Sequence, residues 1–242
     1  MPGVHFIDAR GPEGVRLYAI GDIHGRLDLL EAMYEKIEDD RRDAADWRIV
    51  HLGDYVDRGP DSRGVIDAII RASEGGKVTA IAGNHDIAFL DFIATPDARG
   101  LFARFGGDAT ARSYGVEIAF EPQWLLKDGH RALVAAVPDA HVEFLQVLKL
   151  SFDAGYFFFC HAGIRPGVEL DRQDAQDLVW IRDVFLGHPG LHPKVIVHGH
   201  TPADEPEVLA NRVNVDTGAY FSGVLTALVI DGAEKRLLQA KR

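Results

Sequence analysis

Five short segments of the chain combine glycine with aspartate, asparagine or histidine. In chain order they are GDIHG (21–25), GDYVDRG (53–59), GNHD (83–86), HAG (161–163) and HGHT (198–201). Glycine lets the backbone turn sharply and approach a ligand closely. The neighbouring carboxylate, amide and imidazole groups supply oxygen and nitrogen donors without any thiolate, a set that suits hydrolytic divalent metals such as Mn, Fe, Zn or Co.

The segments contain more donors than one hydrolytic ion usually takes from a protein. The six donor residues are Asp22, His24, Asp54, Asn84, His161 and His200. Two ions that share a carboxylate would use all of them, and pairs of ions about 3.5–4 Å apart are a common device for phosphoester hydrolysis. Bound cations would also give a chain of net charge -11 the local positive charge that a phosphate needs.

The elements that must position these donors are short apolar runs, most of them rich in β-branched residues, one before each segment. They predict strands over 16–20, 47–52, 77–82, 155–160 and 194–197. Apolar residues at helical spacing follow the first two segments, so the chain alternates strand and helix as α/β folds do. Loops at the carboxyl ends of parallel strands converge on one crevice, which would bring the distant donors together.

Two regions depart from this alternation. Residues 87–154 mix aromatic and charged residues with turn signals, and we predict a mainly helical insertion there. After His200, further strands are expected over 212–215, 223–230 and 236–240, the last two joined at Asp231-Gly232. Because there is no repeat, low-complexity tract or linker, we expect a single domain over 1–242.

Composition excludes several classes of protein. The chain has 47% apolar and 26% charged residues, typical of a globular domain, and no three consecutive Lys or Arg, which argues against a nucleic-acid partner. No apolar run approaches the roughly 18 residues of a membrane span. With no secretion signal and one cysteine, Cys160, the expected location is the cytoplasm.

The motifs GDIHG, GDYVDRG, GNHD, HAGI and HGHT, in this order over residues 16–230, resemble the calcineurin-like metallophosphoesterase superfamily. More narrowly they resemble the bacterial and phage branch of its phosphoprotein phosphatases. The resemblance implies a metallophosphatase αββα sandwich of four layers, in which two mixed β-sheets are flanked by helices and the metals lie at one edge.

Carried over motif by motif, the resemblance assigns two metal sites. Asp22 and His24 would bind the first divalent ion, Asp54 would bridge, and Asn84, His161 and His200 would bind the second. Mn is the expected metal, with Fe, Zn, Co and Ni as alternatives.

The resemblance also assigns catalytic and substrate-binding roles. His85 would donate a proton, Asp57 would orient it, and Arg58 would bind phosphate. The segment LVWIR (178–182) resembles the one that supplies a second phosphate-binding arginine, hence Arg182.

The implied reaction is hydrolysis of a phosphomonoester by direct hydroxide attack, with a serine/threonine phosphoprotein as the expected substrate. Asp86 stands where eukaryotic protein phosphatases have Glu, and the last histidine lies in HGHT, both as in the bacterial branch. That branch includes symmetrical diadenosine tetraphosphate hydrolases, so this activity or hydrolysis of another small phosphate ester is the alternative. A metal-binding pseudophosphatase that docks phosphoproteins is the non-enzyme alternative.

Several residues near the motifs have a structural interpretation as well. His200 is favoured over His198 as the ligand, Trp180 is expected to pack rather than to stack on substrate, and Asp216 could support the site or form a turn. Cys160 lies in an apolar run and is expected to be a buried small side chain. Histidines outside the motifs are expected at the surface: His5, His130, His141, His188 and His192.

Overall fold

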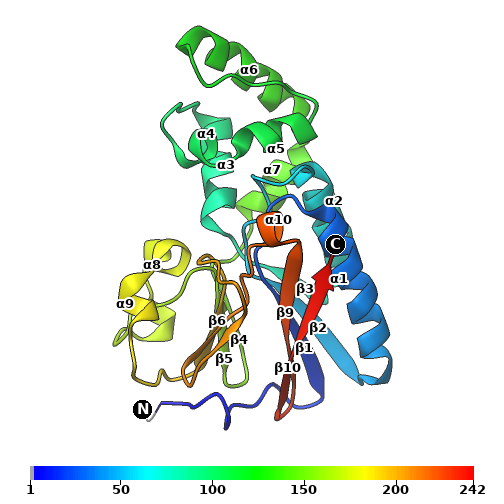
Figure 1. Ribbon diagram of the computed structural model, residues 1–242, viewed down its shortest axis with the longest axis vertical. Helices are drawn as coiled ribbons and strands as arrows, with labels where there is room; N and C mark the ends of the chain where they lie inside the picture. The colour runs from blue at the N-terminus through cyan, green and yellow to red at the C-terminus, as the bar shows by residue number, and fades with distance from the viewer. Residues whose placement is uncertain (1–2) are drawn as a thin grey trace.

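The computed structural model describes residues 3–242 and contains two mixed β-sheets of five strands each (Figure 1). The first sheet has the order β10-β9-β1-β2-β3 and the second the order β4-β5-β6-β8-β7. The strands of the first sheet are β1 (Val15–Ile20), β2 (Asp46–His51), β3 (Val78–Ala80), β9 (Val224–Asp231) and β10 (Glu234–Lys241). Those of the second are β4 (Ser151–Ala154), β5 (Phe157–Cys160), β6 (Val195–His198), β7 (Glu207–Val208) and β8 (Arg212–Asn214).

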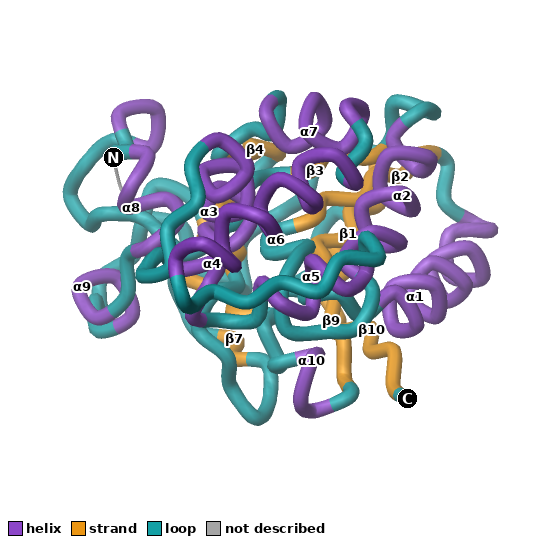
Figure 2. Tube along the Cα trace, turned by 90° about the horizontal axis from the view of Figure 1, so that it is seen from above, coloured by secondary structure: helices purple, strands orange, loops and turns teal. Residues whose placement is uncertain are grey.

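Helices cover both outer faces of this pair of sheets, with α1 on one side and α8 and α9 on the other (Figures 1 and 2). The helices are α1 (Leu27–Asp40), α2 (Ser62–Ser73), α3 (Asn84–Ala94), α4 (Leu101–Arg104), α5 (Gly107–Ser113), α6 (Gln123–Ala136), α7 (Asp139–Gln146), α8 (Ala175–Trp180), α9 (Asp183–Leu186) and α10 (Ala219–Ser222). All eight strands expected from the sequence form within two residues of their expected ends, whereas β4 and β7 were not anticipated.

Alternation of side chains along the strands produces the layers. In β1, Leu17 and Ala19 face the second sheet, while Tyr18 and Ile20 face helices α1 and α2. In β5, Phe157 and Phe159 pack between the sheets, whereas Phe158 and Cys160 pack against α8 and α9. Three apolar clusters therefore separate four layers, and the predicted αββα sandwich is confirmed.

Each sheet contains three adjacent strands that run parallel to one another. β1, β2 and β3 are parallel in the first sheet, and β5, β6 and β8 are parallel in the second. Each of these strands ends at a segment that carries Asp, Asn or His. The two sheets therefore deliver six loops to the same end of the sandwich.

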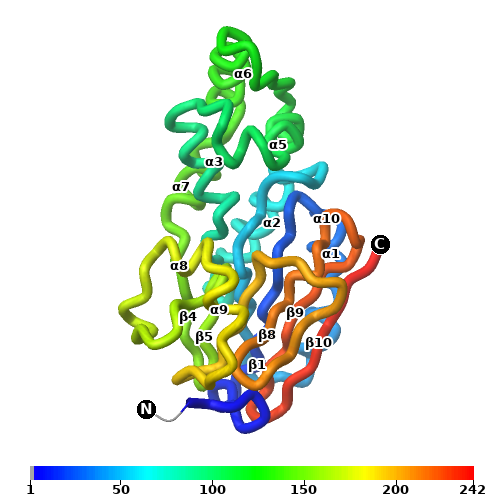
Figure 3. Tube along the Cα trace, turned by 60° about the vertical axis from the view of Figure 1, so that its left-hand side comes forward, coloured from blue at the N-terminus to red at the C-terminus, as the bar shows by residue number. Residues whose placement is uncertain are grey.

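The mainly helical insertion is also confirmed. Helices α3 to α7 stand beyond the end of the sheets to which the loops point (Figures 1 and 3). Their core is aromatic, and the rings of Phe92 and Phe102 lie 4.5 Å apart. The helical part ends at Gln146, and the last residues of the predicted 87–154 segment form strand β4 instead.

Two of the histidines expected at the surface are buried. His141 bridges Tyr114 and Asp67 through its two ring nitrogens, at 2.8 and 2.9 Å. His192 is 2% exposed and stacks against Phe185. The expectation was wrong for His141 because its hydrogen-bond partners lie on distant elements, and for His192 because its ring packs on Phe185 of α9. Within residues 3–242, no helix is long and apolar enough to cross a membrane.

Candidate metal centre and catalytic pocket

A cavity of about 440 Å³ lies where the loops of the two sheets meet. Its lining comprises Asp22, His24, Asp54, Arg58, Asn84, His85, Leu101, Phe105, Trp180, Arg182, His200, Pro202, Asp216 and Tyr220. Eight of the ten site residues expected from the sequence are in this set. The other two, Asp57 and His161, lie buried behind it in contact with His85 and Asn84.

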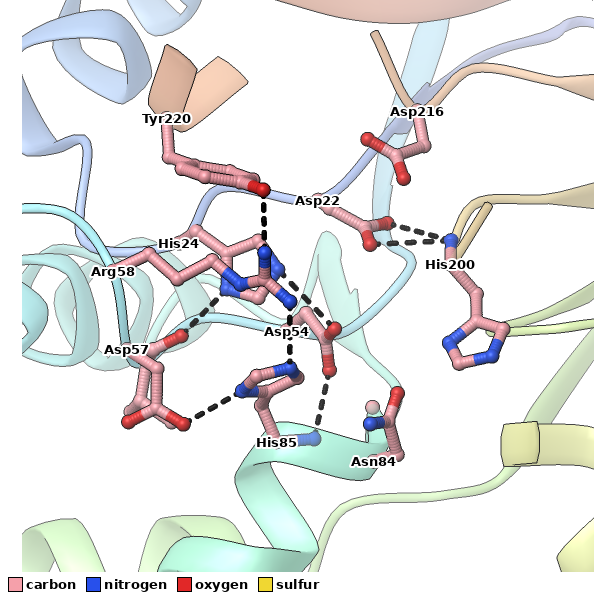
Figure 4. Close-up of polar contacts among 12 residues, drawn as sticks. Asp22, His24, Asp54, Asp57, Arg58, Asn84, His85, His200, Asp216 and Tyr220 are labelled. Carbon is pink, nitrogen blue, oxygen red and sulfur yellow. Dashed lines mark hydrogen bonds and ion pairs between the residues drawn. The ribbon is translucent and has the colours of Figure 1, made fainter. Parts of the chain in front are cut away.

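His24 and Asp54 face each other on the side of the cavity formed by the loops after β1 and β2 (Figure 4). Nδ1 of His24 lies 2.7 Å from the carbonyl oxygen of Val56, and Nε2 lies 3.4 Å from Oδ2 of Asp54. A carbonyl oxygen can only accept, so Nδ1 carries the proton and Nε2 directs a lone pair at the carboxylate. His85 adjoins this pair, and potential ligand atoms of all three residues lie within 4.8 Å of one another.

His161 and His200 complete a second group with the other oxygen of Asp54. Nδ1 of His161 donates to the carbonyl of Leu52 at 2.8 Å. Its Nε2 lies 3.0 Å from Oδ1 of Asn84 and 3.5 Å from Oδ1 of Asp54. Because Asp54 belongs to both groups, the donors are arranged around one shared carboxylate.

This donor set fits two divalent cations. The Nε2 lone pairs of His24 and His161 face the Asp54 carboxylate, an arrangement of acceptors that repel one another unless a cation lies between them. Burial lowers the pKa of His24 to about 3 and that of His200 to about 2, so both rings are neutral, as metal ligands must be. The groups are therefore suited to a dinuclear metal centre.

Backbone strain is concentrated in the same loops. Every residue other than glycine with positive φ in the described part of the chain belongs to them: His24 (45°), Asp54 (54°), Asp57 (72°), Arg58 (72°) and His200 (67°). Such conformations cost of order 1–3 kcal/mol each and persist only where the surrounding structure imposes them. The fold therefore holds these side chains in positions that their backbones would not adopt alone.

Asp22 is held by the loop after β6. Its two oxygens accept from the backbone N–H of His200 at 3.2 and 3.1 Å. A Cβ atom on Gly199 would lie 2.0 Å from Oδ1 of Asp22, so only glycine permits this approach. The HGHT segment thereby positions a carboxylate that lies 178 residues earlier in the chain.

His85 forms a buried pair with Asp57. Its Nδ1 lies 2.6 Å from Oδ2 of Asp57, and the other oxygen of Asp57 accepts from the Thr110 hydroxyl at 2.8 Å. Burial alone would lower the pKa of His85, but the carboxylates of Asp54 and Asp57 outweigh it and raise that pKa above the usual imidazole value. Nε2 of His85 lies 3.4 Å from the Arg58 guanidinium, a neighbour that disfavours a cation at this nitrogen.

The two expected phosphate-binding arginines reach different sides of the cavity. Arg58 donates to the Tyr220 hydroxyl, and its guanidinium lies 4.5 Å from the centre of that ring. Arg182 donates through Nε to Nε2 of His200 at 3.0 Å. Positive charge therefore stands beside each of the two groups of donors.

Sequence patterns did not reveal every residue of the site. Tyr220 and Thr110 contact Arg58 and Asp57 across 162 and 53 residues of chain, and neither lies in a recognisable motif. Asp86, which the motif did contain, accepts from the backbone N–H groups of Asp54 and Tyr55 at 2.8 and 2.9 Å. It therefore holds the second loop in its strained conformation.

The structure gives positions to His198 and Asp216, for which the sequence allowed more than one role. The ring of His198 packs on Phe185 and its Nε2 accepts from Arg212 at 3.3 Å, outside both groups of donors. Asp216 lines the cavity and also accepts from the backbone N–H of Gly218 at 2.9 Å. Burial raises the pKa of Asp216 to about 6. Asp216 thus both shapes the turn and adds a carboxyl group beside Asp22 (Figure 4).

Comparison with known proteins identifies the family of this chain. The family model of the calcineurin-like phosphoesterases matches residues 15–223, most of the chain. The chain belongs to the calcineurin-like phosphoesterase family. Members of this family whose sequences match it include the asymmetrical bis(5'-nucleosyl)-tetraphosphatases PrpE of Anoxybacillus flavithermus and Bacillus cereus strain AH820. Each is 29% identical, and the alignments cover 86% of this chain and 88% of the relative.

Solved structures support the fold of this phosphoesterase. A crystal structure whose protein carries a provisional diadenosine tetraphosphatase name matches with a TM-score of 0.65 at 19% identity, over 96% of this chain and 98% of the other. A metallophosphoesterase from Sphaerobacter thermophilus matches with a TM-score of 0.58 at 18% identity, over 94% and 88% of the two chains. These likenesses establish the metallophosphatase architecture.

Proposed function

We propose that this phosphoesterase hydrolyses bis(5'-nucleosyl) tetraphosphates. The arrangement that carries the chemistry is the pair of donor groups around Asp54, flanked by Arg58 and Arg182 in one cavity. The substrate class is supported by relatives that align over 86% of the chain and are named for it. This inverts the order of the sequence-based expectation, in which a serine/threonine phosphoprotein came first and a dinucleotide was the alternative.

The proposed ligand assignment takes His24, His161, His200 and the shared Asp54 from the two groups, adds Asp22 and Asn84, and keeps His85 as the proton donor. Asp22 and His24 would hold one divalent ion, and Asn84, His161 and His200 the other, with Asp54 shared between them. When bound, the two ions would supply positive charge for the phosphates and activate a water molecule. Mn is the metal we predict, in the cytoplasmic single-domain protein expected from the sequence.

The arginines of the chain would orient the phosphate groups. Arg58 presents a guanidinium whose position is set by Tyr220, and Arg182 approaches from the opposite group beside His200. A guanidinium can form two parallel hydrogen bonds to phosphate oxygens, which fixes direction as well as charge. We propose that the two arginines align the reacting phosphorus with the attacking and leaving oxygens.

His85 would donate the proton that the leaving oxygen takes up. The carboxylates that raise its pKa favour the protonated form of the ring, and Asp57 fixes its direction through Nδ1. General acid assistance of this kind is typically worth about 10²- to 10⁴-fold in rate. It matters most for substrates whose leaving groups are strongly basic.

A substrate comparison tests the proposal. Purified, Mn-loaded protein is assayed on diadenosine tetraphosphate, a phosphoserine peptide and a phosphotyrosine peptide, and kcat/KM is ranked. We expect the dinucleotide to rank first. A phosphopeptide in first place would refute the proposal and restore the protein phosphatase interpretation.

The products of the dinucleotide distinguish two forms of the reaction. Addition of water across the first P–O–P bond gives a mononucleotide and a nucleoside triphosphate, as the word asymmetrical in the names of the relatives describes. Addition across the central bond gives two nucleoside diphosphates, as the sequence-based alternative supposed. Chromatography of the products after one hour separates the two, and we expect the asymmetrical pattern.

A further inference from the structure

A second cavity, of about 250 Å³, adjoins the catalytic pocket. It lies between helices α3 and α4 of the insertion and helix α8, which covers the second sheet. These three helices are neighbours in Figures 1 and 2. Asn84, Leu101 and Trp180 line both cavities. A molecule bound in the second cavity can therefore extend into the catalytic pocket past Asn84.

The two cavities differ in charge. The catalytic pocket contains Arg58 and Arg182, whereas none of the residues that line the second cavity, all within the described part of the chain, is Lys, Arg or His. Instead its rim carries the carboxylates of Asp91 and Asp97, and Phe92 forms part of its buried wall. Such a cavity disfavours phosphate and suits a flat, uncharged group with hydrogen-bond donors.

Trp180 stands at the junction of the two cavities. It is the last residue of α8, and its side chain is 40% exposed although Leu178 and Val179 before it are buried. Its ring lies edge-on to His200, with centroids 5.9 Å apart and planes at 84°. A large aromatic side chain that stays partly exposed beside a catalytic pocket is available to stack on a ligand.

We propose that this cavity, the nucleoside groove (Ile87, Ala88, Asp91, Phe92, Gln176 and Trp180), binds one nucleoside of the substrate while the phosphate chain lies in the catalytic pocket. The base stacks on Trp180, and Asp91 accepts from hydroxyl or amino groups. The inference rests on the proposed function for its substrate. Its volume, slightly below the roughly 300–1,000 Å³ of pockets for drug-sized ligands, suits one base with part of its ribose.

Kinetics with two substrates that share the phosphate chain test the groove. Inorganic tetraphosphate lacks both nucleosides, so the ratio of kcat/KM for diadenosine tetraphosphate to that for inorganic tetraphosphate reports nucleoside binding alone. Stacking of a base on an aromatic ring is worth about 1–3 kcal/mol, which is about 5- to 150-fold in an equilibrium constant, so Trp180→Ala should lower this ratio about fivefold or more. Trp124→Ala, at a 64% exposed tryptophan of α6 outside both cavities, is the matched control and should leave the ratio unchanged.

A second variant distinguishes loss of nucleoside binding from an indirect effect on His200, which Trp180 contacts. Ala88→Phe fills the cavity from α3 without removing Trp180, and it should lower the same ratio. If both variants leave the ratio within twofold of the native protein, the groove does not bind the nucleoside and the proposal is wrong, whatever the native rates are.

Binding of unphosphorylated adenosine distinguishes failure of the groove from failure of the proposed function. In saturation-transfer NMR with the full chain, adenosine should bind the native protein and the Trp124→Ala variant, and lose binding in Trp180→Ala and Ala88→Phe. Adenosine binding without dinucleotide hydrolysis would refute only the proposed function. Dinucleotide hydrolysis without adenosine binding would refute the proposal that the groove binds a nucleoside. Binding of an arginine-rich phosphopeptide at the acidic rim in preference to adenosine would refute it as well.

Discussion

Nδ1 of His85 lies 2.6 Å from Oδ2 of Asp57, and Thr110 of helix α5 holds the other oxygen of that carboxylate at 2.8 Å. Both members of the pair are buried. The helical insertion therefore does more than overhang the pocket, because one of its helices orients the group proposed to donate the proton. This relationship connects a segment without motif residues to the chemistry of the site.

Replacing His85 tests its role as the acid. His85→Asn keeps a polar side chain of similar length but cannot donate a proton to the leaving oxygen. We expect about 10²- to 10⁴-fold lower kcat on phenyl phosphate, a much smaller loss on p-nitrophenyl phosphate, whose leaving group needs little protonation, and unchanged metal content. Equal losses on the two substrates, or loss of a metal by elemental analysis, would reassign His85 to another role.

Asp54 is the carboxylate common to both donor groups. In the native protein, elemental analysis after saturation should find about two transition-metal ions per chain. Asp54→Asn should reduce this content and lower kcat by orders of magnitude, because an amide oxygen is neutral and a poorer ligand. Asp43→Asn, at a side chain that is 79% exposed, is the control and should change neither. Full activity in metal-free native protein would contradict the metal assignment itself.

Gly199 allows the close approach of Asp22. In Gly199→Ala the new Cβ would overlap with Oδ1 of Asp22, so the carboxylate must move away from the cavity. We expect lower affinity for Mn, measured by titration of the metal-free protein, together with reduced activity. Gly75→Ala is the matched control, because no atom beyond the adjacent residues lies within 4 Å of the Cβ position there. Equal metal affinity in the two variants would show that Asp22 is not a ligand.

Tyr220 positions Arg58 through its hydroxyl. Tyr220→Phe removes the hydrogen bond while the aromatic ring below the guanidinium remains. A hydrogen bond typically contributes about 0.5–1.5 kcal/mol, so KM for diadenosine tetraphosphate should rise about 2- to 10-fold. Tyr156→Phe, at a tyrosine that is 50% exposed, serves as the control. An effect on metal content instead of KM would argue against a role in orienting Arg58.

His51 is expected to make the fold sensitive to acid. Its ring is fully buried, Nδ1 has no hydrogen-bond partner within the described residues, and burial lowers its pKa to about 3. The unfolded chain takes up a proton near pH 6.5 that the folded chain resists, so stability falls as pH decreases below that value. At pH 5 this contribution is about 2 kcal/mol.

Urea denaturation at pH 7 and pH 5, with metals removed by chelation, measures this loss. His51→Phe should show a smaller decrease between the two pH values than the native protein. Tyr34→Phe removes only the hydroxyl that lies 2.9 Å from Nε2 of His51, and it should retain the native pH dependence. An identical decrease in His51→Phe would assign the acid sensitivity to other histidines.

Much of this protein was predictable because its motifs are local. A short apolar run next to glycine and a donor residue specifies a strand, a sharp turn and a side chain at the end of the strand, whatever the rest of the chain does. That is why the expected strands formed within two residues of their expected ends and why Asp54 and His200 meet although they lie 146 positions apart. The parallel order of strands in an α/β sheet then brings such ends to one edge.

Tertiary structure alone decided which residues support those donors. The partnership of Thr110 with Asp57, of Tyr220 with Arg58 and the burial of His141 depend on how α5, α10 and α7 pack, and long-range packing leaves no periodic trace in the sequence. The same is true of the nucleoside groove, whose walls come from α3, α4 and α8. Donor types follow from residue identity, whereas the shape and charge of the space around them follow from the assembled fold.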